Sequence, residues 1–127
     1  MSEPTPDDVR RALADFDARK QKIVAGLLTV MMKNPEQVRD REWISEQLTQ
    51  LTLLAGDFEA DTPQDGVRAV QEYLQANSEE LVCATFLLFQ RVGLDMAPRA
   101  QEGFSFEDAL QCGLSYFPGI VTDPDRN

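Results

Sequence analysis

The sequence contains no histidine, and it has only two cysteines and one tryptophan in 127 residues. The missing histidine removes the side chain that most often serves as a general base near neutral pH and as a metal ligand. Catalytic triads, ordinary zinc sites and helical di-iron sites that use histidine are therefore excluded. Cys83 and Cys112 form no CxxC pair and fall in apolar helical stretches, so we expect two buried, reduced thiols.

Long hydrophobic runs are also missing. The longest apolar stretch, residues 81–89, is interrupted by Thr85 and is far shorter than the roughly 20 residues that cross a bilayer. The first residues have neither the basic nor the apolar segment of a secretory signal. We therefore expect a cytoplasmic protein that does not bind membranes. The length is that of one domain over residues 1–127. We expect this domain to be helical, with flexible ends near 1–6 and 120–127, where the sequence is polar or rich in proline.

Positive charge is scarce after residue 41. The whole chain has a net charge of −10, and residues 42–90 contain nine carboxylates against a single base, Arg68. Such a surface does not favour direct contact with nucleic acid, because phosphate binding needs a basic footprint. A basic protein partner fits this charge better. The alternative is that the acids only keep a small protein soluble.

What the sequence does have is helical periodicity. Apolar residues recur at helical spacing from residue 7 to residue 33 and predict one helix, ended by Asn34-Pro35. Its apolar stripe consists of Val9, Leu13, Phe16, Ile23, Leu27 and Met31. A second helical stretch covers residues 35–55, with Asp40 as a candidate break. Its stripe consists of Ile44, Leu48, Leu51 and Ala55, with Trp43 and Leu54 on the flank.

Three further helices complete the expected fold. The third begins at the N-cap Thr62 and runs to residue 76, the fourth covers residues 78–93, and the fifth begins at the N-cap Ser105. Their expected packing residues include Val67, Val70 and Leu74 in the third helix, and Phe106, Ala109, Leu110 and Leu114 in the fifth. The fourth is apolar on nearly every face, which is typical of a buried helix. Because strand patterns are weak, we predict an all-α, single-domain bundle of about five helices with a central apolar helix near residues 79–92.

Two acidic patterns have part of the spacing of a metal site. Glu42 and Glu46 lie four residues apart on one helical face, but the partner ligands of known helical sites are missing. The segment that starts at Asp57 begins like a calcium loop, yet it has Thr62 in place of glycine and Arg68 in place of the closing glutamate. Nucleophile elbows and phosphate-binding glycine loops are absent from the sequence. We therefore assign no catalytic residue, no cofactor and no metal ligand.

Our first hypothesis is a non-enzymatic acidic protein that docks on a basic site of a macromolecular partner, as an inhibitor, an immunity protein or a nucleic-acid mimic does. Charge would steer the encounter, and a few aromatic side chains would supply affinity. The candidate partner-binding residues are Glu42, Trp43, Glu46, Asp57, Glu59, Asp61, Asp65, Glu72 and Tyr73. The second hypothesis is a structural or assembly subunit that self-associates through its helices. A small enzyme that uses carboxylates and a metal is the third.

Overall fold

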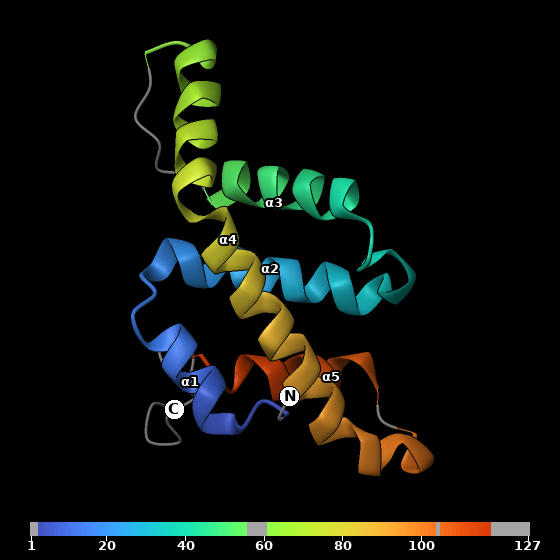
Figure 1. The fold of residues 1–127 in the computed structure, drawn as a ribbon. Coiled ribbons are helices and arrows are strands. Elements are labelled where there is room, and N and C mark those ends of the chain that lie inside the picture. The colour runs from blue at the N-terminus through green and yellow to red at the C-terminus, as the bar shows by residue number, and fades with distance from the viewer. Residues whose placement is uncertain (1–2, 56–60, 104, 118–127) are drawn as a thin grey trace, which may run out of the picture.

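Five α-helices and two short 3-10 helices make up the part of the chain that the structure describes (Figure 1). The computed structural model describes residues 3–55, 61–103 and 105–117. The elements are α1 (Pro6–Ala14), α2 (Ala18–Lys33), η1 (Pro35–Gln37), α3 (Arg41–Ala55), α4 (Pro63–Met96), η2 (Ala97–Glu102) and α5 (Phe106–Leu114). The described residues contain no strand, so the predicted all-α, single-domain bundle of about five helices is confirmed.

The long helix α4 is the centre of the bundle. It contacts α1, α2, α3 and α5, and it crosses α2 diagonally in Figure 1. Its buried side chains are Val70, Leu81, Ala84, Thr85, Leu88, Val92 and Met96. All of these except Val70 lie in the second half of the helix, so the central apolar helix predicted near residues 79–92 is confirmed. The first turns of α4 project beyond the other helices (Figure 1).

α4 is one helix of 34 residues, whereas the sequence predicted two helices that meet at Asn77-Ser78. Asn77 does not cap a new helix. Its side-chain amide donates a hydrogen bond to the Tyr73 carbonyl, one turn earlier in the same helix, at 2.9 Å. The sequence between Val67 and Val92 contains no glycine or proline, the two residues that disfavour helix most strongly. The predicted break was therefore wrong, because a residue suited to capping is also tolerated inside a long helix.

The opposite error occurs near the N-terminus, where the single helix expected over residues 7–33 is two helices. α1 ends at Ala14, and α2 begins with Asp17 as its N-cap, whose carboxylate accepts a hydrogen bond from the Lys20 amide at 2.9 Å. Aspartate favours such caps over helix interiors, because its short side chain bonds to the backbone. Phe16 lies in the turn and still packs in the core, so the apolar stripe continues across the break.

The predicted helix starts at Thr62 and Ser105 are confirmed. The Thr62 hydroxyl accepts a hydrogen bond from the Asp65 amide at 3.1 Å, and Ser105 and Asp108 form a reciprocal capping box. Asp40 ends the irregular segment before α3, since its carboxylate accepts from the Glu42 amide at 3.0 Å. All six residues of the stripe predicted between residues 7 and 33 are buried.

The two cysteines are more accessible than the sequence indicated. Cys83 is exposed and Cys112 is half-buried, so the prediction of two buried thiols was wrong. Even the central helix has a side that no other described helix covers, and Cys83 lies on that side. Apolar residues close to it, such as Val82 and Phe86, are only half-buried. The segment near residues 79–92 is therefore apolar on nearly every face but is not buried on every face.

Candidate functional site

The acidic residues predicted to bind a partner lie on α3 and on the first half of α4. We call residues 41–55 and 61–80 the α3–α4 arm. Glu42 and Glu46 are exposed on α3, while Asp61, Asp65 and Glu72 are exposed at or near the start of α4. Asp57 and Glu59 lie outside the described residues. The arm carries seven carboxylates against two arginines, so its surface is strongly negative.

These carboxylates are spread along the arm and do not converge on one point. In Figure 1 α3 begins at the end far from α4, and the start of α4 projects away from the bundle. The described residues contain no group of three or more Cys, Asp or Glu side chains that could hold a metal ion. The arrangement therefore suits a broad electrostatic surface.

The two aromatic candidates, Trp43 and Tyr73, are half-buried and pack against the core. The Arg19 guanidinium lies 5.4 Å from the centroid of the Tyr73 ring. Burial raises the pKa of the Tyr73 phenol, and the negative charge of Asp17 adds to the effect. Both rings are thus partly engaged within the fold, and the Tyr73 hydroxyl oxygen is buried.

Sequence reasoning missed the apolar side chains that the arm exposes. Leu54 is 82% exposed, and Leu53 and Val67 are each 51% exposed. Val67 was expected to pack, but only Val70 is buried in the first turns of α4. Leu53 and Leu54 are adjacent residues at the end of α3, and the buried face of that helix is formed by Ile44, Leu48 and Thr52. The sequence indicated this exposure only by the adjacency of the two leucines, because a narrow helical stripe does not include two successive residues.

A groove lies between α3 and the middle of α4. Its main part has a volume of about 760 Å³ and is lined by Val38, Arg39, Arg41, Ile44, Ser45, Leu48, Ser78, Glu79, Val82 and Phe86. A second hollow of about 420 Å³ shares Ser45, Leu48 and Ser78 with it and extends toward Arg68 and Glu72. Glu72 is the only predicted partner-binding residue that lines either hollow within the described chain. The groove thus combines apolar residues with charges of both signs.

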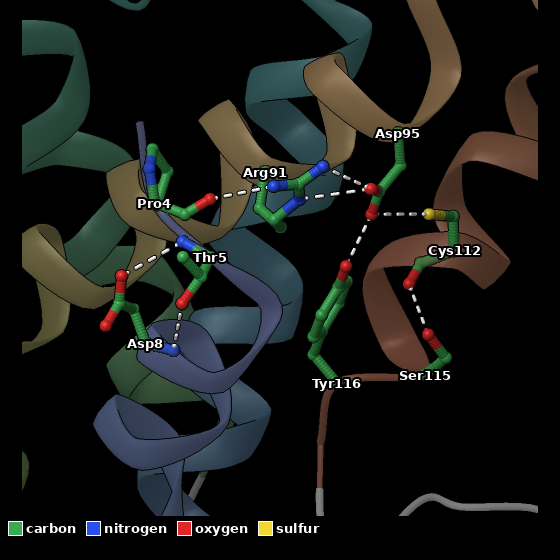
Figure 2. A network of polar contacts seen from close by, with 8 residues as sticks. All are labelled: Pro4, Thr5, Asp8, Arg91, Asp95, Cys112, Ser115 and Tyr116. Atoms are coloured by element: carbon green, nitrogen blue, oxygen red, sulfur yellow. Dashed lines mark hydrogen bonds and ion pairs between the residues drawn. The ribbon is translucent and has the colours of Figure 1, made fainter. Parts of the chain in front are cut away.

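A polar network that the sequence analysis did not identify surrounds Asp95 on α4 (Figure 2). The Asp95 carboxylate accepts hydrogen bonds from Arg91 Nε at 3.0 Å and Nη2 at 2.6 Å, from the Tyr116 hydroxyl, and from the Cys112 thiol at 3.6 Å. Arg91 Nη1 also donates to the Pro4 carbonyl at 2.8 Å. The network therefore ties the segment before α1 and the end of α5 to the central helix.

The electrostatics of this network favour a structural role. Burial alone would raise the pKa of Asp95, but hydrogen bonds from Arg91 and Tyr116 outweigh it and hold that pKa below its ordinary value. Burial and the bond to Asp95 raise the pKa of Tyr116 to about 12. Burial and the same carboxylate also raise the pKa of the Cys112 thiol. The thiol and the phenol thus stay protonated near neutral pH, and neither is activated as a nucleophile.

Within the described residues, one helical segment (residues 63–99) is long and apolar enough to cross a membrane. The central helix of a bundle meets the same criterion, and α4 packs against four other helices. A third of the residues in the most apolar part of this segment are buried within the fold. The buried side chains of α4, from Leu81 to Met96, account for the part of this segment that packs in the core.

Comparison of the chain with protein-family models, with curated proteins and with solved structures gives no match.

Proposed function

We propose that this is a non-enzymatic binding protein whose α3–α4 arm docks on a basic protein partner. The observation that carries the proposal is the coincidence of two kinds of side chain on the arm. Three of the four large hydrophobic side chains exposed in the described residues, Leu53, Leu54 and Val67, belong to it. The same arm carries seven carboxylates against two arginines. Exposed apolar anchors accompanied by charged residues are typical of protein interfaces.

The two kinds of side chain would contribute differently. Full burial of a leucine side chain contributes about 2 kcal/mol, so the largely exposed Leu54 has most of that gain still available. The half-exposed Leu53 and Val67 have smaller parts of it available. The carboxylates would mainly speed the encounter with a basic surface and orient the complex. Because exposed charges are screened by salt, association should slow as ionic strength rises.

Two charge-reversal variants test the proposal. The arm variant carries Glu46→Lys, Asp61→Lys and Glu72→Lys. The matched control carries Glu3→Lys, Asp15→Lys and Glu36→Lys, which are exposed acids outside the arm. Both variants change the net charge by the same amount, so a general charge effect would alter them equally.

The measurement is affinity capture from a lysate of the source cells, at low and at raised salt, with quantitative mass spectrometry. We expect a basic protein that the wild type and the control retain, that the arm variant loses, and that salt releases. Equal retention by both variants would contradict the proposal. So would the absence of any protein that the wild type enriches over the arm variant.

Self-association is the second candidate, since the same exposed leucines could meet those of another copy. A symmetric dimer through the arm would bring two negatively charged surfaces together, which opposes that contact. Sedimentation analysis over a wide concentration range distinguishes the two candidates. A dimer that Leu54→Ser dissociates would favour self-association, and a monomer at all concentrations would favour a separate partner.

A further inference from the structure

We propose that a second site, at the opposite end of α4 from the arm, binds the hydrocarbon chain of a fatty acid. A pocket of about 400 Å³ lies between the end of α2, the last turns of α4 and the start of α5. Its lining consists of Met32, Pro35, Phe89, Val92, Gly93, Met96, Ala97, Phe106 and Ala109. This volume is within the range of about 300–1,000 Å³ that is usual for small-molecule sites.

The lining selects an apolar ligand. None of the described residues that line the pocket has a charged or hydrogen-bonding side chain. A polar molecule would lose its hydration there without replacement hydrogen bonds. Two of the lining side chains, Met32 and Met96, are flexible thioethers that adapt to chains of varying shape. The groove on the arm differs, because Arg39, Arg41 and Glu79 line it.

Lys33 supplies a positive charge near the pocket for the anionic head group of the ligand. Its ammonium lies 5.5 Å from the centroid of the Phe106 ring, and Phe106 is a pocket-lining residue that is 37% exposed. Lys33 is exposed and has no ion-pair partner among the described residues, whereas Lys20 is paired with Glu80. A carboxylate held at Lys33 would therefore lie close to Phe106, from which its chain would extend along the pocket.

Gly93 lines the pocket and is itself exposed. A Cβ atom at Gly93 would meet nothing within 4 Å, although the residue lies in the interior of a long helix, where glycine is unfavourable. A larger side chain at this position would occupy open space next to the pocket lining. Gly93 thus offers a blocking variant, Gly93→Leu, and a conservative control, Gly93→Ala.

The test uses sodium dodecanoate, below its micelle concentration, as the probe and methyl NMR of labelled methionines as the readout. We expect saturable shifts of the Met32 and Met96 methyl signals, with a smaller change at Met31, which is fully buried outside the pocket lining. Gly93→Leu should weaken binding by at least about tenfold, equivalent to roughly 1.4 kcal/mol, and Gly93→Ala by much less. Phe106→Ala, which removes part of the pocket wall, is a second blocking variant. The Met31 signal reports whether each variant is folded.

The head group is tested with dodecanol as the matched neutral probe. Lys33→Gln should weaken dodecanoate binding by about threefold, as expected for an exposed ion pair, and should leave dodecanol binding unchanged. Non-saturable shifts, or equal affinity of the wild type and folded Gly93→Leu and Phe106→Ala variants, would overturn the pocket assignment. Equal loss of dodecanol and dodecanoate affinity in Lys33→Gln, or no loss of either, would overturn the assignment of Lys33.

Discussion

Replacing Tyr116 by phenylalanine removes one hydroxyl group from the Asp95 network and leaves the rest of the side chain in place. Tyr116 is only 7% exposed, and its hydroxyl donates to a carboxylate that Arg91 also binds. Hydrogen bonds to charged groups contribute about 1.5–3 kcal/mol. Since Asp95 keeps its bonds from Arg91, we take the lower end, about 1.5 kcal/mol. For a chain of this length the melting temperature should fall by about 5 °C.

The same substitution predicts a change in the alkaline stability profile. The pKa of Tyr116 is raised from 10.0 to about 12 in the folded protein. Between these two values the unfolded state binds fewer protons than the native state, so stability falls as pH rises. One pKa unit corresponds to about 1.4 kcal/mol, so Tyr116 alone should remove about 2–3 kcal/mol between roughly pH 10 and pH 12. The Tyr116→Phe variant lacks this loss.

Urea unfolding of both chains, followed by the helical circular dichroism signal from neutral to alkaline pH, checks both expectations. The wild type should be the more stable chain near neutral pH, and its advantage should shrink and then reverse above roughly pH 11. Tyr73 also has a raised pKa, but it is present in both chains and cancels in the difference. Equal stability near neutral pH, together with parallel profiles at alkaline pH, would refute the role assigned to the Tyr116–Asp95 bond.

Three further predictions concern packing and thiol access. Gly93→Ala should stabilise the protein by about 1 kcal/mol in urea unfolding, because its Cβ meets nothing within 4 Å. Gly113→Ala should destabilise the protein by about 1–3 kcal/mol in the same assay, because the new Cβ would lie 2.6 Å from Cδ2 of the fully buried Leu28. If both glycine substitutions changed the stability in the same direction, these two predictions would be contradicted. Cys83 should react with a thiol reagent faster than Cys112, whose thiol is half-buried and has a raised pKa, as mass spectrometry of the modified peptides would show; faster labelling of Cys112 would contradict this.

Much of the fold was predictable because its signals are local. A cap such as Thr62 or Ser105 acts on amides within three residues, so the sequence alone identifies it. The break between α1 and α2 was hidden because Phe16, which lies in the turn, continues the buried stripe. The continuity of α4 was not predicted because Asn77 suits a helix cap as well as a helix interior, where its amide bonds to the Tyr73 carbonyl.

The candidate sites were less predictable, because they depend on contacts between distant segments. The Asp95 network joins Pro4, Arg91 and Tyr116, which no short spacing connects. Only the Arg91–Asp95 pair has a visible signal, since residues four apart share a helical face. The exposure of Leu54 also depended on where α3 meets its neighbours. Sequence patterns gave the charge of the arm, and the three-dimensional arrangement was needed to find its apolar residues.

Site-specific photo-crosslinking in the source cells tests the central claim most directly. A photoreactive amino acid is placed at Leu54, on the α3–α4 arm, and in a matched chain at Gln90, an exposed position of α4 outside the arm. We predict a covalent adduct with one basic protein from position 54, none from position 90, and loss of that adduct in the arm charge-reversal variant. The same adduct from both positions, or none from position 54, would contradict docking through the arm.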